Sequence, residues 1–230
     1  MLLELAEPSV RAGVWDHSSF RKDPMMRLKR TGFAAMMTVY GPRSAAEDMI
    51  ARVRQMHARV EGTTEDGTAY HANDPRLLDW VQATATFGFV EAYSRFVAPL
   101  SQAEKSAAFL EGVPAAELYG AIAVPRSWRE WESLLDRTAP MLEGSPVLDE
   151  FLTIMATARI LPPPLRWLQR MLVRAAVEVT PDRVRSLPQL QGKGLRRGEM
   201  SLLRLLARLA GRAPMGDLPP AQAERRLAGT

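Results

Sequence analysis

The 230-residue chain contains no cysteine and only three histidines, His17, His57 and His71. The absence of cysteine excludes disulfides, thiolate metal sites and cysteine nucleophiles. The sequence also lacks a Gly-x-Ser-x-Gly nucleophile elbow and a glycine-rich phosphate loop, so neither a serine hydrolase of that type nor a nucleotide cofactor is supported. Chemistry that uses an imidazole therefore has very few candidate residues.

Long apolar runs are absent as well. No stretch reaches the roughly 18 consecutive apolar residues that a membrane span requires. The first ten residues carry Glu4 and Glu7, whereas a secretory signal peptide begins with basic residues. We therefore expect a cytoplasmic protein, and its 47% hydrophobic and 24% charged residues are ordinary for a globular domain.

The charge is distributed unevenly along the chain. Residues 1–158 hold 16 Lys and Arg against 21 Asp and Glu, whereas residues 159–230 hold 14 against 5. The net charges are thus −5 and +9. The basic third is either a solvated face or a surface for an anionic partner. No aromatic residues interleave with the terminal arginines, so we expect no nucleic-acid binding.

One segment of the basic third has the pattern of an interfacial helix. Residues 200–212, MSLLRLLARLAGR, combine leucines with regularly spaced arginines. A basic amphipathic helix of this kind is suited to the surface of an anionic membrane. The segment is therefore a candidate for peripheral membrane contact.

Signals for helix starts recur along the chain, and strand alternation is not evident. The first helix should cover residues 2–15, with a kink or break at Pro8. Asp23-Pro24 and Asp74-Pro75 each place a capping residue before a proline at the first helical position. The helix that starts at Pro24 should stop at Gly41-Pro42.

Three Ser-x-x-Glu patterns predict further helix starts through capping boxes. They are Ser44 with Glu47, Ser101 with Glu104, and Ser127 with Glu130. Together these signals predict an all-α fold. We expect a single helical domain over residues 1–230, with a loosely ordered tail from about 213 to 230.

The helix that starts at Ser44 should carry His57 on its apolar face. Ile50, Val53, His57 and Val60 recur at spacings of three and four, and Gly62 should end the helix. His57 is then either a hydrogen-bonded core residue or a metal ligand. Zinc needs three or four protein ligands, whereas heme iron needs only one imidazole, so heme is the cofactor that this inventory can hold.

Arg27, Arg30 and Thr31 share one face of the preceding helix, at positions i, i+3 and i+4. An arginine is rarely buried without a partner, because desolvating its guanidinium is costly. The two arginines either remain in water, pair with a carboxylate such as Asp16 or Asp23, or bind an anionic ligand.

The segment after His57 predicts a turn and then a long helix. Residues 63–74 are rich in Gly, Thr, Asp and Asn, which favours a short hairpin or ordered loop with His71 exposed. In the helix from Pro75 to about Val97, the apolar stripe should follow one row of positions. This row contains Leu78, Gln82, Ala85, Phe89, Ala92 and Phe96. We expect Trp80 and Phe89 to pack in the core.

Several of these motifs resemble one known family. They are GVWDHSSFRKDPMMRLKRTGFAAMMTVYG, QMHARVEG, the G-x-x-Y-x-A-x-D-P pattern and LLDWVQAT, with LPPPLRWLQRMLV and TPDRVRSLPQL further on. The chain is similar in these segments to the family of rubber oxygenase (latex-clearing protein) and mycophenolic acid B-type oxygenases. The resemblance spans nearly the whole chain and is strongest between Gly13 and Tyr93.

The resemblance implies an all-helical domain with a globin-like core that binds heme b, an iron cofactor. His57 matches the proximal ligand of the family. Arg27, Arg30 and Thr31 match the residues that face the distal side, with Arg30 where the rubber oxygenase has lysine. Gln82 stands where the family has histidine, and we expect it to line the cofactor pocket.

The resemblance also implies the reaction. Such relatives use dioxygen for oxidative attack on a C=C bond, so we expect a heme-dependent oxygenase with a small hydrophobic substrate. The alternative is a non-catalytic interaction protein with a degenerate heme site. It would dock an anionic partner or membrane surface through its basic C-terminal third.

Overall fold

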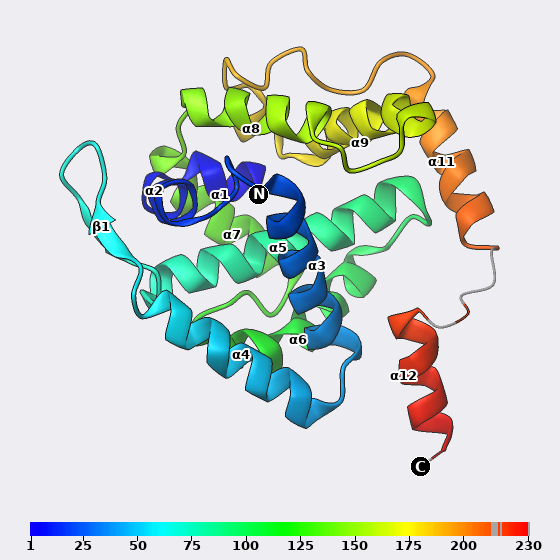
Figure 1. The fold of residues 1–230 in the computed structure, drawn as a ribbon, viewed down its shortest axis with the longest axis horizontal. Helices are drawn as coiled ribbons and strands as arrows, with labels where there is room; N and C mark the ends of the chain where they lie inside the picture. Colours follow the sequence, from blue (N-terminus) through cyan, green and yellow to red (C-terminus); the bar gives the residue numbers. More distant parts are fainter. Residues whose placement is uncertain (213–215, 217, 230) are drawn as a thin grey trace.

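A computed structural model describes residues 1–212, 216 and 218–229 and confirms the all-α class (Figure 1). The described part contains twelve α-helices, two short 3₁₀-helices and one two-stranded hairpin. Their bounds are α1 (Leu2–Ala6), α2 (Pro8–His17), α3 (Pro24–Tyr40), α4 (Arg43–His57), β1 (Glu61–Thr63), β2 (Ala69–His71), α5 (Pro75–Phe96), α6 (Gln102–Tyr119), α7 (Trp128–Thr138), η1 (Ala139–Met141), α8 (Pro146–Thr157), η2 (Pro163–Leu165), α9 (Arg166–Val179), α10 (Asp182–Arg185), α11 (Glu199–Ala210) and α12 (Pro219–Ala228). Among the described residues, none of the helices combines the length and the hydropathy that a membrane-spanning segment needs.

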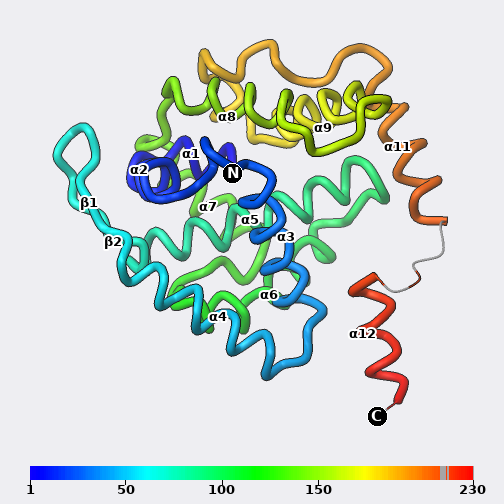
Figure 2. Tube along the Cα trace, viewed as in Figure 1, coloured from blue at the N-terminus to red at the C-terminus, as the bar shows by residue number. Residues whose placement is uncertain are grey.

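The core is built around α5, which runs through the middle of the molecule (Figures 1 and 2). Nine of its 22 residues are buried. Trp80 stacks on Trp131 of α7 with ring centroids 5.9 Å apart, and Phe87 stacks on the same indole at 4.7 Å. Aromatic pairs at these distances add to the stabilisation that burial provides.

Most of the predicted helix starts are confirmed. Pro8 separates α1 from α2, and Asp23 accepts a hydrogen bond from the Met26 amide at 2.9 Å. Asp74 accepts from the Arg76 amide at 2.8 Å in the same way. Ser101 and Ser127 cap α6 and α7. These caps were predictable because each depends only on residues within one turn.

The predicted capping box at Ser44 is wrong. α4 begins at Arg43 after Pro42, and no side chain caps it. Ser44 lies inside the first turn, while the Glu47 carboxylate accepts a hydrogen bond from Arg43 Nε at 2.7 Å. Pro42 occupies the capping position instead, so the helix starts two residues earlier than a cap at Ser44 predicts.

The end of α4 also differs from the prediction. The helix stops at His57 rather than at Gly62, because the chain turns directly into β1. The predicted hairpin is confirmed, with Glu61 opposite His71 and a tip at Gly67, whose φ is 89°. A Cβ at Gly62 would lie 2.7 Å from the Tyr70 hydroxyl, so any other residue here would force the Tyr70 ring to move.

The predicted apolar stripe of α5 is wrong in part. Trp80 is buried as expected, at 3% exposure, but Phe89 is 65% exposed. Helices α1, α6, α7 and α9 pack around α5, and these contacts bury a different row of its side chains. The face with Gln82 and Phe89 is left partly open.

Helix α3 has no buried residue although it is largely apolar. It packs mainly against α4 and α12, and Thr38 Oγ1 lies 3.2 Å from the Tyr119 hydroxyl of α6. Phe33 is 60% exposed. Contacts with neighbouring helices, rather than burial in the core, therefore keep α3 in place.

The tail expected to be loosely ordered contains α12, which packs on α3. Arg226 of α12 donates a hydrogen bond to the Tyr40 carbonyl. Residues 213–215, 217 and 230 of the predicted tail lie outside the described residues.

A single buried amide closes the corner between α8 and α9. The Gln169 Nε2 donates to the carbonyls of Met155 and Ala158 at 2.7 and 2.8 Å. Its Oε1 accepts from the Leu161 amide at 3.1 Å. The side chain thus satisfies three backbone groups where the proline-rich segment cannot continue a helix.

Candidate functional site

The predicted arginines and histidine come together where α3 begins and α4 ends. Arg30 Nη2 lies 3.8 Å from the Met56 sulfur, one residue before His57. The charge of Arg27 lies close enough to lower the pKa of the His57 imidazole. The antiparallel packing of α3 and α4 therefore creates one basic corner with an imidazole in it.

The environment of His57 favours its neutral form. Burial lowers the pKa of His57, and the charges of Arg27 and His71 lower it further. Its Nδ1 is buried and has no hydrogen-bond partner among the described residues. A neutral imidazole with an unsatisfied nitrogen is the form that binds a metal ion.

Arg27 is held in place by Thr31. The guanidinium donates to the Thr31 hydroxyl, and that hydroxyl donates to the Arg27 carbonyl at 2.9 Å. Burial is the largest influence on the pKa of Arg27 and lowers it, while the charge of Glu4 opposes this effect. Arginine nevertheless stays charged in proteins, so this corner carries a fixed cation.

Neither arginine forms an ion pair within the described part of the chain. The predicted alternative of pairing with Asp16 or Asp23 is therefore not seen there. Arg30 and Thr31 are exposed, whereas Arg27 is half-buried. A half-buried guanidinium without a carboxylate can bind an anionic group.

Two residues near this corner escaped the sequence analysis. His71 was expected to be exposed, but it is half-buried, its charge acts on His57, and its Nδ1 accepts a hydrogen bond from the Asn73 amide at 3.1 Å. Glu4 of α1 acts on Arg27 across 23 residues of sequence. No local pattern signals either proximity, because each depends on how separate elements pack.

Gln82 lies on the partly open face of α5 and is half-buried. Its backbone carbonyl accepts from the Thr86 hydroxyl at 3.1 Å. In the described part of the chain, no hydrogen bond engages its side-chain amide. The side-chain amide of Gln82 is therefore available to a ligand. It makes no hydrogen bond to Arg27, Arg30 or His57.

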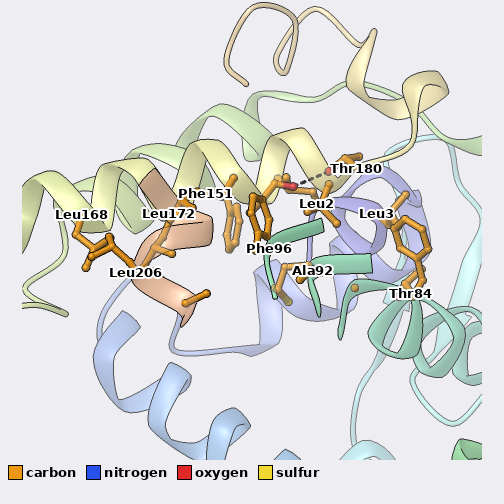
Figure 3. A pocket seen from close by; sticks show the side chains of 18 of the residues that line it. Leu2, Leu3, Thr84, Ala92, Phe96, Phe151, Leu168, Leu172, Thr180 and Leu206 are labelled. Atoms are coloured by element: carbon orange, nitrogen blue, oxygen red, sulfur yellow. Dashed lines mark hydrogen bonds between the residues drawn. The ribbon is translucent and has the colours of Figure 1, made fainter. Parts of the chain in front are cut away.

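A separate apolar cavity of about 540 Å³ lies between the chain start, α5, α8, α9 and α11 (Figure 3). Its volume is in the range of small-molecule sites. Its walls are formed mainly by aliphatic and aromatic side chains. These include Leu2, Leu3, Phe87, Ala92, Phe96, Phe151, Leu168, Leu172, Leu203 and Leu206.

The two hydroxyls in the cavity wall are already used. Thr84 donates to the Val81 carbonyl at 3.0 Å, and Thr180 donates to the Ala176 carbonyl at 2.9 Å. The wall therefore offers a ligand very few free hydrogen-bond donors. A cavity of this chemistry suits an apolar ligand better than a polar one.

None of Arg27, Arg30, Thr31, His57 and Gln82 lines this cavity. The two features meet at α1, where Leu2 and Leu3 belong to the cavity wall and the next residue, Glu4, acts on Arg27. The structure thus places an apolar cavity beside a basic, imidazole-containing corner.

No group of three or more His, Asp or Glu side chains among the described residues could hold a metal ion. This finding is compatible with heme, whose iron requires only one protein imidazole.

The comparisons with known proteins give one match. Neither a search of curated proteins nor a search of solved structures finds a match for this chain. The family described as "ER-bound oxygenase mpaB/B'/Rubber oxygenase, catalytic domain" matches residues 1–213. This match covers most of the chain and agrees with the motifs noted in the sequence. The chain belongs to the family of mpaB-type and rubber oxygenase catalytic domains.

Proposed function

We propose that this oxygenase domain depends on heme b and acts on a hydrophobic, unsaturated substrate. Membership of the family supports oxygenase activity, with dioxygen and an organic substrate as reactants. The observation that carries the heme proposal is the buried Nδ1 of His57, which has no partner among the described residues. No hydrogen bond engages the His57 imidazole among the described residues, so the ring is free to serve as an iron ligand.

The basic corner fits the rest of the cofactor. Heme carries two propionate carboxylates, and Arg27 and Arg30 are cations without a carboxylate partner in the described structure. Their planar guanidinium groups are suited to binding carboxylates. We assign them to the propionates or to the polar distal side.

Thr31 and Gln82 complete the proposed site. Thr31 fixes the orientation of Arg27, and we propose that the same hydroxyl lies near dioxygen when the cofactor is bound. The amide of Gln82 would line the pocket and offer both a donor and an acceptor.

The cavity provides the place for the substrate. Heme, when bound, supplies the activation of dioxygen for attack on a C=C bond. The protein's part is to exclude water and to orient an apolar molecule, and the walls around Phe96, Phe151 and Leu206 have the required chemistry. Leu2 and Leu3 of its wall are followed in the chain by Glu4, whose charge acts on Arg27.

The proposal is tested by heme content. His57→Ala should abolish heme retention, measured by the Soret band and the pyridine hemochrome method, because the iron loses its protein ligand. His71→Ala is the matched control, since it removes the neighbouring imidazole and should keep close to one heme per chain. Equal heme content in the two variants would overturn the ligand assignment.

The same measurement of heme content distinguishes the proposed oxygenase from the alternative function. A colourless protein that cannot be reconstituted with hemin would favour a non-catalytic interaction protein with a degenerate site. A heme-loaded protein should be tested next for oxygen consumption with unsaturated hydrophobic compounds.

A further inference from the structure

We propose that α11 docks on an anionic lipid bilayer and holds the open end of the apolar cavity against it, so that a hydrocarbon chain can enter the cavity from the lipid. The docking part of this inference does not depend on heme. Only the identity of the entering chain as substrate rests on the proposed function.

The first observation is the exposure of α11. Of its twelve residues, only Leu203 is buried. Leu202, Leu205 and Leu209 recur at spacings of three and four, and all three are exposed. They form one apolar row along the outer side of the helix.

The second observation is a row of arginines beside these leucines. Arg204, Arg208 and Arg212 are spaced by four residues, and all are exposed. No ion pair between described residues involves any of them; Arg204 and Arg208 donate only to backbone carbonyls. A leucine row flanked by unpaired arginines is the pattern of a helix that lies in the interface of an anionic membrane.

The third observation is that α11 also forms a wall of the cavity. Leu203, Leu206, Ala207 and Ala210 contribute to its lining. On the helical wheel this row adjoins the exposed leucine row, so a bilayer that receives the leucines also lies next to the cavity.

The cavity is buried at one end and exposed at the other. Figure 3 shows Leu3 and Thr84 at one end, and Leu168, Leu172 and Leu206 at the opposite end. Leu3 and Thr84 are buried, whereas Leu172 of α9 and Ala210 of α11 are exposed. The cavity therefore opens between α9 and α11, on the side that the proposed docking helix occupies.

The charge selects a membrane over a second copy of the chain. In a symmetric dimer through α11, the arginine rows of two copies would approach each other, and like charges disfavour such a contact. Residues 159–230 carry a net charge of +9, which an anionic bilayer complements. The occupant that fits both rows is a lipid surface with anionic headgroups.

The first test is co-sedimentation with vesicles of phosphatidylcholine and phosphatidylglycerol, with pure phosphatidylcholine vesicles for comparison. Arg208→Gln/Arg212→Gln should weaken binding to the anionic vesicles about 25-fold, since each basic residue near the surface contributes roughly five-fold. The matched control is Arg129→Gln/Arg137→Gln on α7, which also neutralises two exposed arginines. Equal binding of both variants, or no binding of the unaltered protein, would overturn the proposal.

The second test addresses the leucine row. Leu205→Asp should abolish vesicle binding, whereas Leu110→Asp on α6 should not, although Leu110 is 55% exposed and Leu205 only 46%. Light scattering distinguishes the other occupant. If the unaltered protein is a dimer, and Leu205→Asp dissociates this dimer without changing vesicle binding, the leucine row contacts a second copy of the chain and not a membrane.

The third test addresses the cavity itself, with a fluorescent polyene fatty acid as the probe. Ala207→Phe fills the wall beside α11 and should lower the probe's affinity at least ten-fold. Ala107→Phe on α6 is the control, because this residue is exposed and lies outside the cavity. If Ala207→Phe leaves the affinity for the probe unchanged, the proposed entry of a hydrocarbon chain beside α11 is wrong. None of these readouts requires heme, so their failure is distinguishable from failure of the heme proposal.

Discussion

Helices α3 and α5 begin in the same way and are held in the fold in opposite ways. Each starts with an Asp cap followed by proline, and each is largely apolar. Yet α5 buries nine of its 22 residues, whereas α3 buries none of its 17. The core fixes α5, while α3 depends on α4, α12 and a few hydrogen bonds.

This difference indicates where the protein can accept a ligand. Apolar side chains that the fold leaves uncovered, such as Phe33 and Phe89, do not stabilise the chain by burial. The basic corner lies at the start of α3, and Phe33 follows Thr31 by two residues on the same helix. A cofactor bound there would complete the packing of α3, which the polypeptide alone leaves unfinished.

The largest expected effect is on the α5 side of the comparison. Trp80→Ala should lower the free energy of unfolding by about 3–5 kcal/mol, because it removes a buried indole from the stack with Trp131. Urea denaturation monitored by circular dichroism measures this change. A loss below about 1 kcal/mol would show that α5 is not the centre of the core.

A smaller effect should appear in the pH dependence of stability. The pKa of His57 is lowered in the folded protein, so below its ordinary value of 6.5 the unfolded chain binds a proton that the folded chain does not. Stability should therefore fall as pH falls from about 7.5 through 6.5 toward the folded pKa. His57→Gln should flatten this part of the curve in urea denaturation at several pH values. An unchanged slope would show that His57 is not buried as the structure places it.

The smallest effect is expected on α3. Phe33→Ala should change the free energy of unfolding by no more than about 0.5 kcal/mol without cofactor, because the ring is already in solvent. The same urea experiment as for Trp80→Ala measures it. A loss comparable to that of Trp80→Ala would erase the distinction between the two helices.

The sequence predicted local features of the fold well. The caps at Asp23, Asp74, Ser101 and Ser127 follow from hydrogen bonds that close within one turn. The end of α4 was misplaced because strand pairing between Glu61 and His71, a contact between separate segments, stops the helix. The stripe of α5 was misassigned because periodicity shows that a helix has faces but not which neighbours will cover them.

The same distinction between local patterns and contacts of separate segments applies to the candidate site. The spacing of Arg27, Arg30 and Thr31 predicts that they share one face of a helix, and the pattern around His57 predicts the helical face on which it lies. The influence of Glu4 and His71 depends on the packing of α1 and β2 against that corner, which no short pattern encodes. The apolar cavity was not predictable from the sequence, because its wall is assembled from five segments between Leu2 and Ala210.

The Gln169 amide has a consequence for the shape of the apolar cavity. It fixes how α8 leads into α9, and these two helices supply Phe151 and Leu168 to the cavity wall. A glutamate would have nearly the same shape but could not donate to the two carbonyls, so the corner would open. The dimensions of the cavity are thus set in part by a residue that does not line it.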